Sequence, residues 1–336
     1  MWGFHTRGMG FSTGFMAPPW PKFMPRLLTM VRNLVFIMVC ALSIGLAGAW
    51  SGEAQARSPA PSQGRQEAGF SSDRLTVSVR GSGPDVILIP GLASTSAIWE
   101  RTAKALEGRY RVHMVTVRGF GDLAPEANAS GAISGPVAGE LIRYIDHQKL
   151  RAPAVIGHSM GGQIALRMAA ARPDHIGRVM VVDSSPFFPS LISAGATSAD
   201  VEPLARIVYQ GLMLFGDQAL KTTASNAGLE LGGASDSLFN SLGWQGGDRR
   251  TLAQGLYEVM TSDLRAFLPN IRAPVTVVYG WSPDSNNPRA QVDELFRNGY
   301  RNLSTPARFE RVEGAEHMVM IDQPRRFQAA VERFLS

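Results

Sequence analysis

The sequence predicts an α/β fold in which helices cover both faces of a mostly parallel sheet. Short apolar runs recur along the chain, and amphipathic helical patterns lie between them. Runs that are apolar at every position are typical of strands buried on both faces, as in parallel sheets. Alternation of such strands with helices at this spacing is the pattern of α/β architecture.

The individual elements follow from these patterns. Residues 75–79 alternate in polarity and indicate an edge strand, whereas residues 86–89 are apolar throughout and indicate a buried one. Further strands are predicted over 112–117, 154–156, 179–182, 275–279 and 309–312, and helices over 97–106, 137–145, 162–171 and 323–335.

One interval interrupts this alternation. Between residues 183 and 275 there is no clear buried strand, and aromatic residues such as Tyr209, Phe239 and Trp244 lie among glycine-rich turns. We expect a helical insertion over the sheet here, at about residues 186–265. Ligand sites are concave and largely apolar, so some side chains of the insertion should face a site.

The N-terminal 56 residues have the organisation of a secretory signal peptide. Lys22, Arg26 and Arg32 precede an uncharged apolar segment, and Ala54-Gln55-Ala56 forms a small-x-small cleavage pattern. We therefore expect an exported protein, periplasmic or secreted, whose mature chain starts near Arg57. The alternative is an uncleaved N-terminal anchor, and only in that case do we expect association with a membrane.

Charge and composition restrict the kind of partner. The first 56 residues hold four of the 33 basic and one of the 28 acidic side chains, so the remaining chain has a net charge of only +2. It contains no block of Lys and Arg, so nucleic-acid binding is not expected. Residues 57–73 are rich in Ser, Pro, Gln and Gly and are predicted to form a disordered linker. Residues 74–336 are then one large domain, and a small molecule is the expected partner.

A serine framed by glycines marks the candidate nucleophile. Gly157-His158-Ser159-Met160-Gly161-Gly162 follows a predicted strand and opens a predicted helix. A serine on such a strained turn projects its hydroxyl from the carboxyl edge of the sheet. Glycines are needed on either side because side chains there would collide as the strand reverses into the helix. The alternative interpretation is a glycine-rich turn with a buried serine.

The candidate base is His317. A serine hydroxyl is a weak nucleophile until a base accepts its proton. Of the six histidines, His317 directly follows the last predicted strand and therefore lies at the same edge of the sheet as the serine. Its place after both the serine and a suitable acid matches the chain order of this type of turn. His158 is expected to point to the wrong side of the turn to act as the base.

Two aspartates are candidates for the acid that orients His317. Asp284 follows the predicted strand 275–279, and Asp183 ends the predicted strand 179–182. Either could hold the second imidazole nitrogen and stabilise the imidazolium ion. Both lie between the serine and His317 in the chain; Asp284 is favoured, and Asp183 is the alternative.

Two backbone amides are the candidate oxyanion hole. Pro90-Gly91-Leu92 follows the predicted strand 86–89, so the amide of Leu92 can point toward the same place as the amide of Met160. Two such donors stabilise the negative charge of a tetrahedral intermediate.

Taken together, these motifs resemble the α/β-hydrolase fold family over about residues 74–336. The motifs that carry the resemblance are Pro90-Gly91-Leu92, Arg118-Gly119-Phe120-Gly121-Asp122, the Gly157 to Gly162 turn, Asp263-Leu264 before Pro274-Val275, and Gly314 to His317. The resemblance implies the α/β-hydrolase fold, with the insertion at about residues 186–265 as a helical lid between strands 6 and 7 of the sheet. The family's acid loop commonly reads Gly-x-x-Asp, whereas here Pro283 takes that place and Asp284 comes one residue late, which keeps Asp183 in contention.

The function predicted from these residues is that of an exported serine hydrolase. It would cleave a small or medium carboxylic ester through an acyl-enzyme intermediate, with no cofactor and no metal. One alternative is an acyltransferase or perhydrolase that uses the same triad. The other is a non-catalytic protein that binds a small molecule on this fold.

Overall fold

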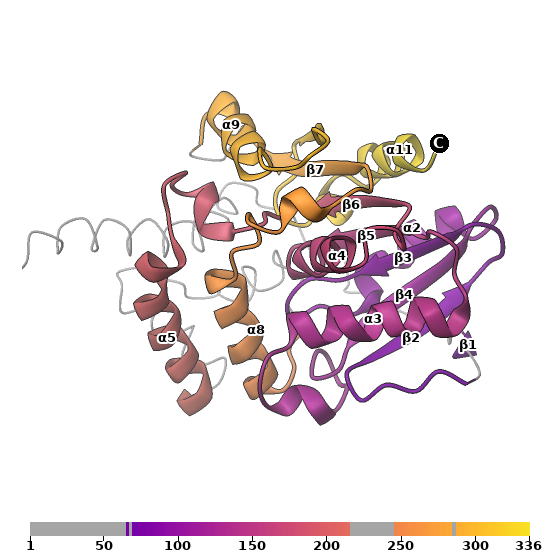
Figure 1. Ribbon diagram of the computed structural model, residues 1–336, viewed down its shortest axis with the longest axis horizontal. Helices are drawn as coiled ribbons and strands as arrows, with labels where there is room; N and C mark the ends of the chain where they lie inside the picture. Colours follow the sequence, from indigo (N-terminus) through magenta and orange to yellow (C-terminus); the bar gives the residue numbers. More distant parts are fainter. Residues whose placement is uncertain (1–64, 67–68, 216–244, 284–286) are drawn as a thin grey trace, which may run out of the picture.

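The computed structural model describes residues 65–66, 69–215, 245–283 and 287–336. These residues form an eight-stranded sheet in the order β1-β2-β4-β3-β5-β6-β7-β8 (Figure 1). The strands are β1 (Arg65–Gln66), β2 (Leu75–Arg80), β3 (Asp85–Ile89), β4 (Arg111–Val117), β5 (Ala154–His158), β6 (Arg178–Val182), β7 (Val275–Trp281) and β8 (Arg308–Glu313). The β1–β2 and β2–β4 pairs are antiparallel, and every pair from β4 to β8 is parallel. The predicted mostly parallel sheet is confirmed.

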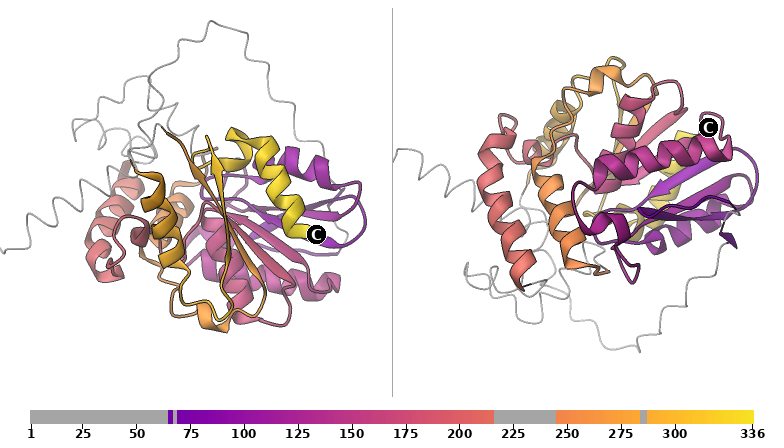
Figure 2. Two further views of the ribbon diagram at one scale, coloured as in Figure 1. Left: turned by 90° about the horizontal axis from the view of Figure 1, so that it is seen from above. Right: turned by 60° about the horizontal axis from the view of Figure 1, so that its bottom comes forward.

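Helices cover both faces of this sheet (Figures 1 and 2). The α-helices outside the insertion are α2 (Glu100–Leu106), α3 (Ser134–Gln148), α4 (Met160–Ala171), α9 (Arg289–Gly299), α10 (Val319–Asp322) and α11 (Pro324–Leu335). Short 3₁₀ turns are η1 (Ser96–Trp99), η2 (Glu126–Ala129), η3 (Phe188–Leu191) and η4 (Leu268–Asn270). Helices α3, α4 and α9 contribute to the core on one face, and α2, α10 and α11 contribute to the core on the other.

Strand β3 shows why the sheet is buried on both faces. Ile87 and Ile89 join the core under α3 and α4, while Val86 and Leu88 join the core under α2 and α11. Successive side chains of a strand point to opposite faces, so an uninterrupted apolar run supplies both cores at once. The continuous apolar pattern of the sequence is therefore explained.

Helix α9 is absent from the sequence-based prediction. Its sequence is strongly charged and only Phe296 and Gly299 are buried. The Phe296 ring stacks on the ring of Tyr279 in β7, with centroids 4.2 Å apart. The Tyr279 hydroxyl also donates to Asp293 of α9 at 2.7 Å. The helix is thus held by side-chain contacts to β7 although it has too few apolar residues to show a clear helical period.

Two α-helices lie between β6 and β7 in the described part of the chain, where the sequence predicted a helical insertion. Helices α5 (Ser198–Phe215) and α8 (Arg249–Thr261) run side by side at one end of the sheet (Figures 1 and 2). They share a small apolar core of their own that includes Val201, Leu212 and Leu256. Residues 216–244 of the insertion lie outside the described residues.

A buried carboxylate fastens α8 to the main domain. Glu258 is 8% exposed, and its two oxygens accept hydrogen bonds from the Ile133 and Ser134 amides at 2.7 and 2.8 Å. These amides are at the start of α3, where no carbonyl of the helix itself is available to them. A negative charge at a helix amino terminus is also favoured by the helix dipole. Glu258 therefore acts as a cap for a helix far away in sequence.

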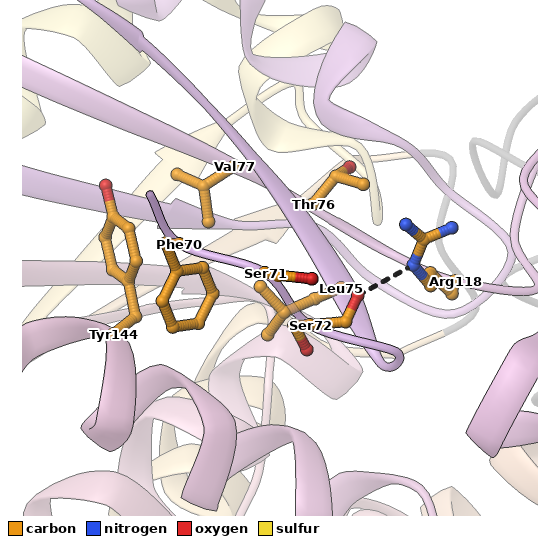
Figure 3. Close-up of a pocket in the computed structure, with 8 residues that line it drawn as sticks. All are labelled: Phe70, Ser71, Ser72, Leu75, Thr76, Val77, Arg118 and Tyr144. Carbon is orange, nitrogen blue, oxygen red and sulfur yellow. Dashed lines mark hydrogen bonds between the residues drawn. The ribbon is translucent and has the colours of Figure 1, made fainter. Parts of the chain in front are cut away.

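The folded domain begins upstream of residue 74. Phe70 packs edge-on against Tyr144 with ring centroids 4.9 Å apart, and Arg118 Nε donates to the carbonyl oxygen of Ser72 at 3.1 Å (Figure 3). These residues line a pocket between β2 and α3. The part of the predicted 57–73 linker that contains Phe70 and Ser72 is thus held against the domain. The predicted signal peptide, residues 1–56, lies outside the described residues.

Replacing Glu258 by Ala is expected to lower the free energy of unfolding by about 2–4 kcal/mol, because two buried amides lose a charged acceptor. Urea denaturation followed by circular dichroism measures this change. Glu258→Gln keeps one acceptor oxygen and should lose about half as much. The matched control is Glu294→Ala, on the exposed surface of α9, and a loss as large for Glu294→Ala as for Glu258→Ala would contradict the capping role.

Candidate active site

Ser159 lies at the turn between β5 and α4 in a backbone conformation that few residues adopt. Its φ and ψ are 53° and −121°, and it is 7% exposed. Non-glycine residues with positive φ outside the left-handed helical region are strained and are concentrated at functional sites. The turn is held by Ser159 N–H, which donates to the Val182 carbonyl at 3.0 Å, and by Ser184 Oγ, which donates to the Ser159 carbonyl at 2.7 Å.

Glycine is required on both sides of this serine, as the sequence predicted. A β-carbon on Gly157 would lie 2.2 Å from the carbonyl oxygen of Gly161. A β-carbon on Gly161 would lie 2.4 Å from the carbonyl oxygen of Ile89. Both obstacles are backbone atoms, which cannot move aside as a flexible side chain can. The turn and the end of β3 therefore pack together only with glycine at these two positions.

His317 is held by Asp183. His317 Nδ1 donates to Asp183 Oδ2 at 2.7 Å, and both side chains are 19% exposed. The other oxygen of the carboxylate, Oδ1, accepts from the Gly280 amide at 3.1 Å. Asp183 N–H donates to the Val278 carbonyl at 2.7 Å. The carboxylate is thus fixed by β7 and by the loop after β8, although Asp183 itself follows β6.

Of the two predicted acids, the alternative one is in contact with the base. Asp284, which the sequence favoured, lies outside the described residues. Asp183 adopts φ = 44°, a left-handed conformation that turns the chain sharply at the end of β6. Sequence alone does not reveal this turn. Because β6 and β7 are parallel neighbours that end at the same edge of the sheet, sequence position also does not distinguish an aspartate after one strand from an aspartate after the other.

The loop that carries His317 approaches β7 closely. A β-carbon on Gly280 would lie 2.3 Å from the Glu316 carbonyl oxygen and 2.6 Å from that of Ala315. Glu316 N–H in turn donates to Asp322 Oδ2 at 2.9 Å. Gly280 was not predicted as a site residue, because in the sequence it is only a glycine at the end of a predicted strand.

His158, which the sequence set aside as a base, contacts the candidate base His317. Its ring is 1% exposed, and Nε2 donates to the backbone carbonyl of His317 at 2.9 Å. The two imidazole rings have centroids 4.6 Å apart. Burial, followed by the nearby His317, lowers the pKa of His158 well below its ordinary value. His158 is therefore neutral at physiological pH.

The predicted oxyanion loop lies against the serine. A β-carbon on Gly91 would come 3.0 Å from Ser159 Cβ, so the loop after β3 touches the nucleophile turn. Met160 is the first residue of α4, so its amide has no acceptor within the helix. The amide of Leu92 is in the same loop as Gly91, one residue later. Both predicted donors thus belong to segments that meet at Ser159.

Helix α8 passes directly over this loop. A β-carbon on Gly255 would lie 2.6 Å from Leu92 Cδ1 and 3.7 Å from Met160 Sδ. Leu92 also packs against the apolar core of α5 and α8. The side chains next to the candidate oxyanion hole are therefore apolar and belong partly to the insertion. Gly255 was not identified from the sequence.

The remaining described histidines lie apart from this site. His113 is fully buried and is bonded through Nδ1 to the Tyr144 hydroxyl at 2.7 Å and through Nε2 to Asp85 at 2.9 Å. His147 ends α3, and His175 lies in the loop before β6. Neither a cluster of three or more potential metal ligands nor a helix able to cross a membrane is found among the described residues.

Comparison with known proteins agrees with this architecture. Residues 86–330 match the alpha/beta hydrolase family. The chain belongs to this family.

Its relatives include named esterases. The chain is 28% identical to a pimeloyl-[acyl-carrier protein] methyl ester esterase of Nitrosomonas europaea over 220 residues, which cover 61% of this chain and 80% of that protein. It is 28% identical to the protein of the same name from Aeromonas hydrophila over 279 residues, 78% of this chain and all of that protein. Among solved structures, a thermophilic esterase from Thermogutta terrifontis aligns with a TM-score of 0.60 and 19% identity, over 78% of this chain and 92% of that one. That structural likeness shows the shared fold.

The depressed pKa of His158 predicts a dependence of stability on pH. Below about pH 6.5 an exposed histidine of the unfolded chain binds a proton that the native His158 does not bind. The free energy of unfolding should therefore fall as the pH is lowered from about 6.5 toward the native pKa, by up to about 1.4 kcal/mol per pH unit.

Urea denaturation at a series of pH values between 5 and 8 measures this slope. The same series is measured for His158→Gln, which cannot take up that proton. The difference between the two pH slopes of the free energy of unfolding is the contribution of His158. His147→Gln, which alters an exposed histidine, serves as the control. Equal slopes for the wild-type protein and His158→Gln would show that His158 is not held neutral by the fold.

Proposed function

We propose that this protein is a serine hydrolase that cleaves a small or medium carboxylic ester. Ser159 is the nucleophile, His317 the general base and acid, and Asp183 the orienting acid. The observation that carries the proposal is the 2.7 Å hydrogen bond between Asp183 and His317 beside the strained turn at Ser159. Three groups of the kinds that acyl transfer needs are placed at one edge of the sheet.

Each group has a defined task in the reaction. Asp183 accepts a hydrogen bond from Nδ1–H of His317, which leaves the Nε2 lone pair free to take the hydroxyl proton of Ser159. The serine oxygen then attacks the ester carbonyl carbon and forms a tetrahedral intermediate. The amides of Leu92 and Met160 donate to its oxyanion, and each such donor contributes on the order of a hundred-fold in rate.

The intermediate then collapses in two stages. His317 Nε2 returns the proton to the alcohol oxygen as the ester bond breaks, which leaves an acyl group on Ser159. Water, deprotonated by the same nitrogen, attacks the acyl-enzyme and releases a carboxylic acid and the free serine. Neither stage requires a metal or a cofactor.

Ester substrates are favoured over other acyl compounds by the relatives of the chain. Two relatives that share 28% identity with it are named as methyl ester esterases, and one of them aligns with this chain over its own whole length. The apolar side chains of Leu92 and of the α5–α8 core next to the oxyanion loop are suited to an apolar acyl chain. Hydrolysis rates on a series of p-nitrophenyl esters of graded acyl length would define the preferred substrate.

The variants Ser159→Ala and His317→Ala should each lower kcat by about a thousand-fold or more, because triad members act as a unit. Asp183→Asn should lower kcat severely, because a neutral amide no longer stabilises the imidazolium ion or holds the required tautomer. Asp284→Asn should leave kcat within about threefold of wild type. Hydrolysis of p-nitrophenyl acetate measures all four. Most activity surviving in Ser159→Ala would refute the nucleophile, and a severe loss in Asp284→Asn with little loss in Asp183→Asn would transfer the orienting role to Asp284.

We also propose that the protein is exported and cleaved after Ala56. The support is the basic segment, apolar run and Ala54-Gln55-Ala56 pattern of the sequence. When the full chain is expressed in a bacterium, the intact mass of the protein in the periplasm or medium should equal that of residues 57–336. A full-length mass confined to the membrane fraction would instead indicate an uncleaved anchor, and a full-length mass in the cytosol would refute export.

A further inference from the structure

His158 is a buried polar residue that the reaction sequence above does not use. Its Nε2 lies 2.9 Å from the backbone carbonyl oxygen of His317. A carbonyl oxygen can only accept, so Nε2 carries the hydrogen and donates it. This fixes the tautomer and leaves Nδ1 as an unprotonated acceptor.

That second nitrogen has no hydrogen-bond partner within the described part of the chain. It faces the oxyanion loop, where a β-carbon on Gly91 would lie 2.9 Å from it. A buried acceptor without a donor is destabilising, commonly by about 1–3 kcal/mol. An apolar side chain of similar size would fill the space without this cost, so packing alone does not account for a histidine at this position.

The position of His158 suggests what the histidine does. It precedes Ser159 directly, and its Nε2–H reaches the backbone of His317, so the nucleophile turn and the base are joined through one side chain. Other contacts to His317 come from the ends of β6 and β7: Asp183 holds its ring, and Gly280 leaves room for its loop. The His158 contact joins the base directly to the residue that precedes the nucleophile in the chain.

We propose that His158 is a positioning residue, which holds the main chain of His317 at a fixed place relative to Ser159. The inference rests on the proposed function, because it assumes that proton transfer between Ser159 and His317 limits the reaction. Errors of about 1 Å in such a distance can reduce turnover by about a hundred-fold. A residue that sets this distance should therefore affect kcat much more than KM.

The neutral state of His158 is suited to this role. During the reaction His317 becomes an imidazolium ion, and its ring lies 4.6 Å from that of His158. A second positive charge at that distance would oppose proton transfer. The titratable group that faces His158 is His317, and the carboxylates of Asp183 and Asp322 interact with His317 in turn. Burial and His317 lower the pKa of His158.

Two substitutions by amide side chains test whether the hydrogen bond donated to His317, and not just a polar side chain at position 158, is what matters. In His158→Gln, the side-chain amide is long enough to replace Nε2 and donate to the His317 carbonyl. In His158→Asn, the amide ends near the former position of Nδ1 and is too short to reach it. Wild type, both variants and Ser159→Ala would be compared as full chains by steady-state hydrolysis of p-nitrophenyl acetate and by thermal denaturation.

We expect His158→Asn to lower kcat by about 10- to 100-fold with KM within about twofold of wild type, and His158→Gln to recover most of the loss. A spectroscopic readout accompanies these rates. The proton shared by His317 and Asp183 should give a far-downfield proton resonance, which Asp183→Asn would remove. That resonance should shift or broaden in His158→Asn and return toward the wild-type position in His158→Gln.

Equal kcat values for the Gln and Asn variants would overturn the proposal, as would a wild-type downfield resonance in both. If His158→Asn does not fold, His158→Gln alone tests the proposal. A folded His158→Gln variant with a large loss of kcat would show that a hydrogen-bond donor at this position is not sufficient, and would overturn the proposal. Failure of the proposed function looks different: Ser159→Ala would then retain turnover. If Ser159→Ala is inactive while His158→Asn is unaffected, only the positioning role of His158 is lost.

Discussion

Asp183 connects three separate segments of this site. Its main-chain N–H donates to β7, one carboxylate oxygen accepts from the Gly280 amide, and the other accepts from His317. A residue at the end of β6 thereby fixes the end of β7 and the loop after β8. The parallel order of these strands makes this possible, because parallel neighbours end at the same edge of the sheet.

Close backbone contacts that exclude side chains shape the site together with these hydrogen bonds. Gly157, Gly161 and Gly280 each lie where a β-carbon would meet a carbonyl oxygen at 2.2–2.4 Å. These contacts press the nucleophile turn against β3 and the His317 loop against β7. The strained conformation of Ser159 is maintained by this packing, and such strain persists only where the surroundings determine it. The insertion contributes through α8, which Glu258 anchors to α3 and which covers the oxyanion loop.

The sheet and the nucleophile turn could be predicted from the sequence because each has a local signature. Continuous apolar runs mark the strands, and the Gly157 to Gly162 pattern marks the turn. The acid could not be decided, because Asp183 and Asp284 follow adjacent strands and the left-handed conformation of Asp183 has no signal in the sequence. Helix α9 has a stacked aromatic contact and a hydrogen bond from Tyr279 to Asp293 in place of an apolar face. The roles of His158 and Glu258 depend on contacts 159 and about 125 residues away in sequence. Long-range contacts of this kind have no local pattern.

The central claim is that the strained serine at position 159 is an activated nucleophile. Its most direct test is to treat the full chain with diethyl p-nitrophenyl phosphate, an acylation mimic that captures activated serines, and to locate the adduct by mass spectrometry of peptides. If Ser159 is the nucleophile, the protein should carry one diethylphosphoryl group, on Ser159. An unmodified protein, or an adduct on another residue, would contradict it.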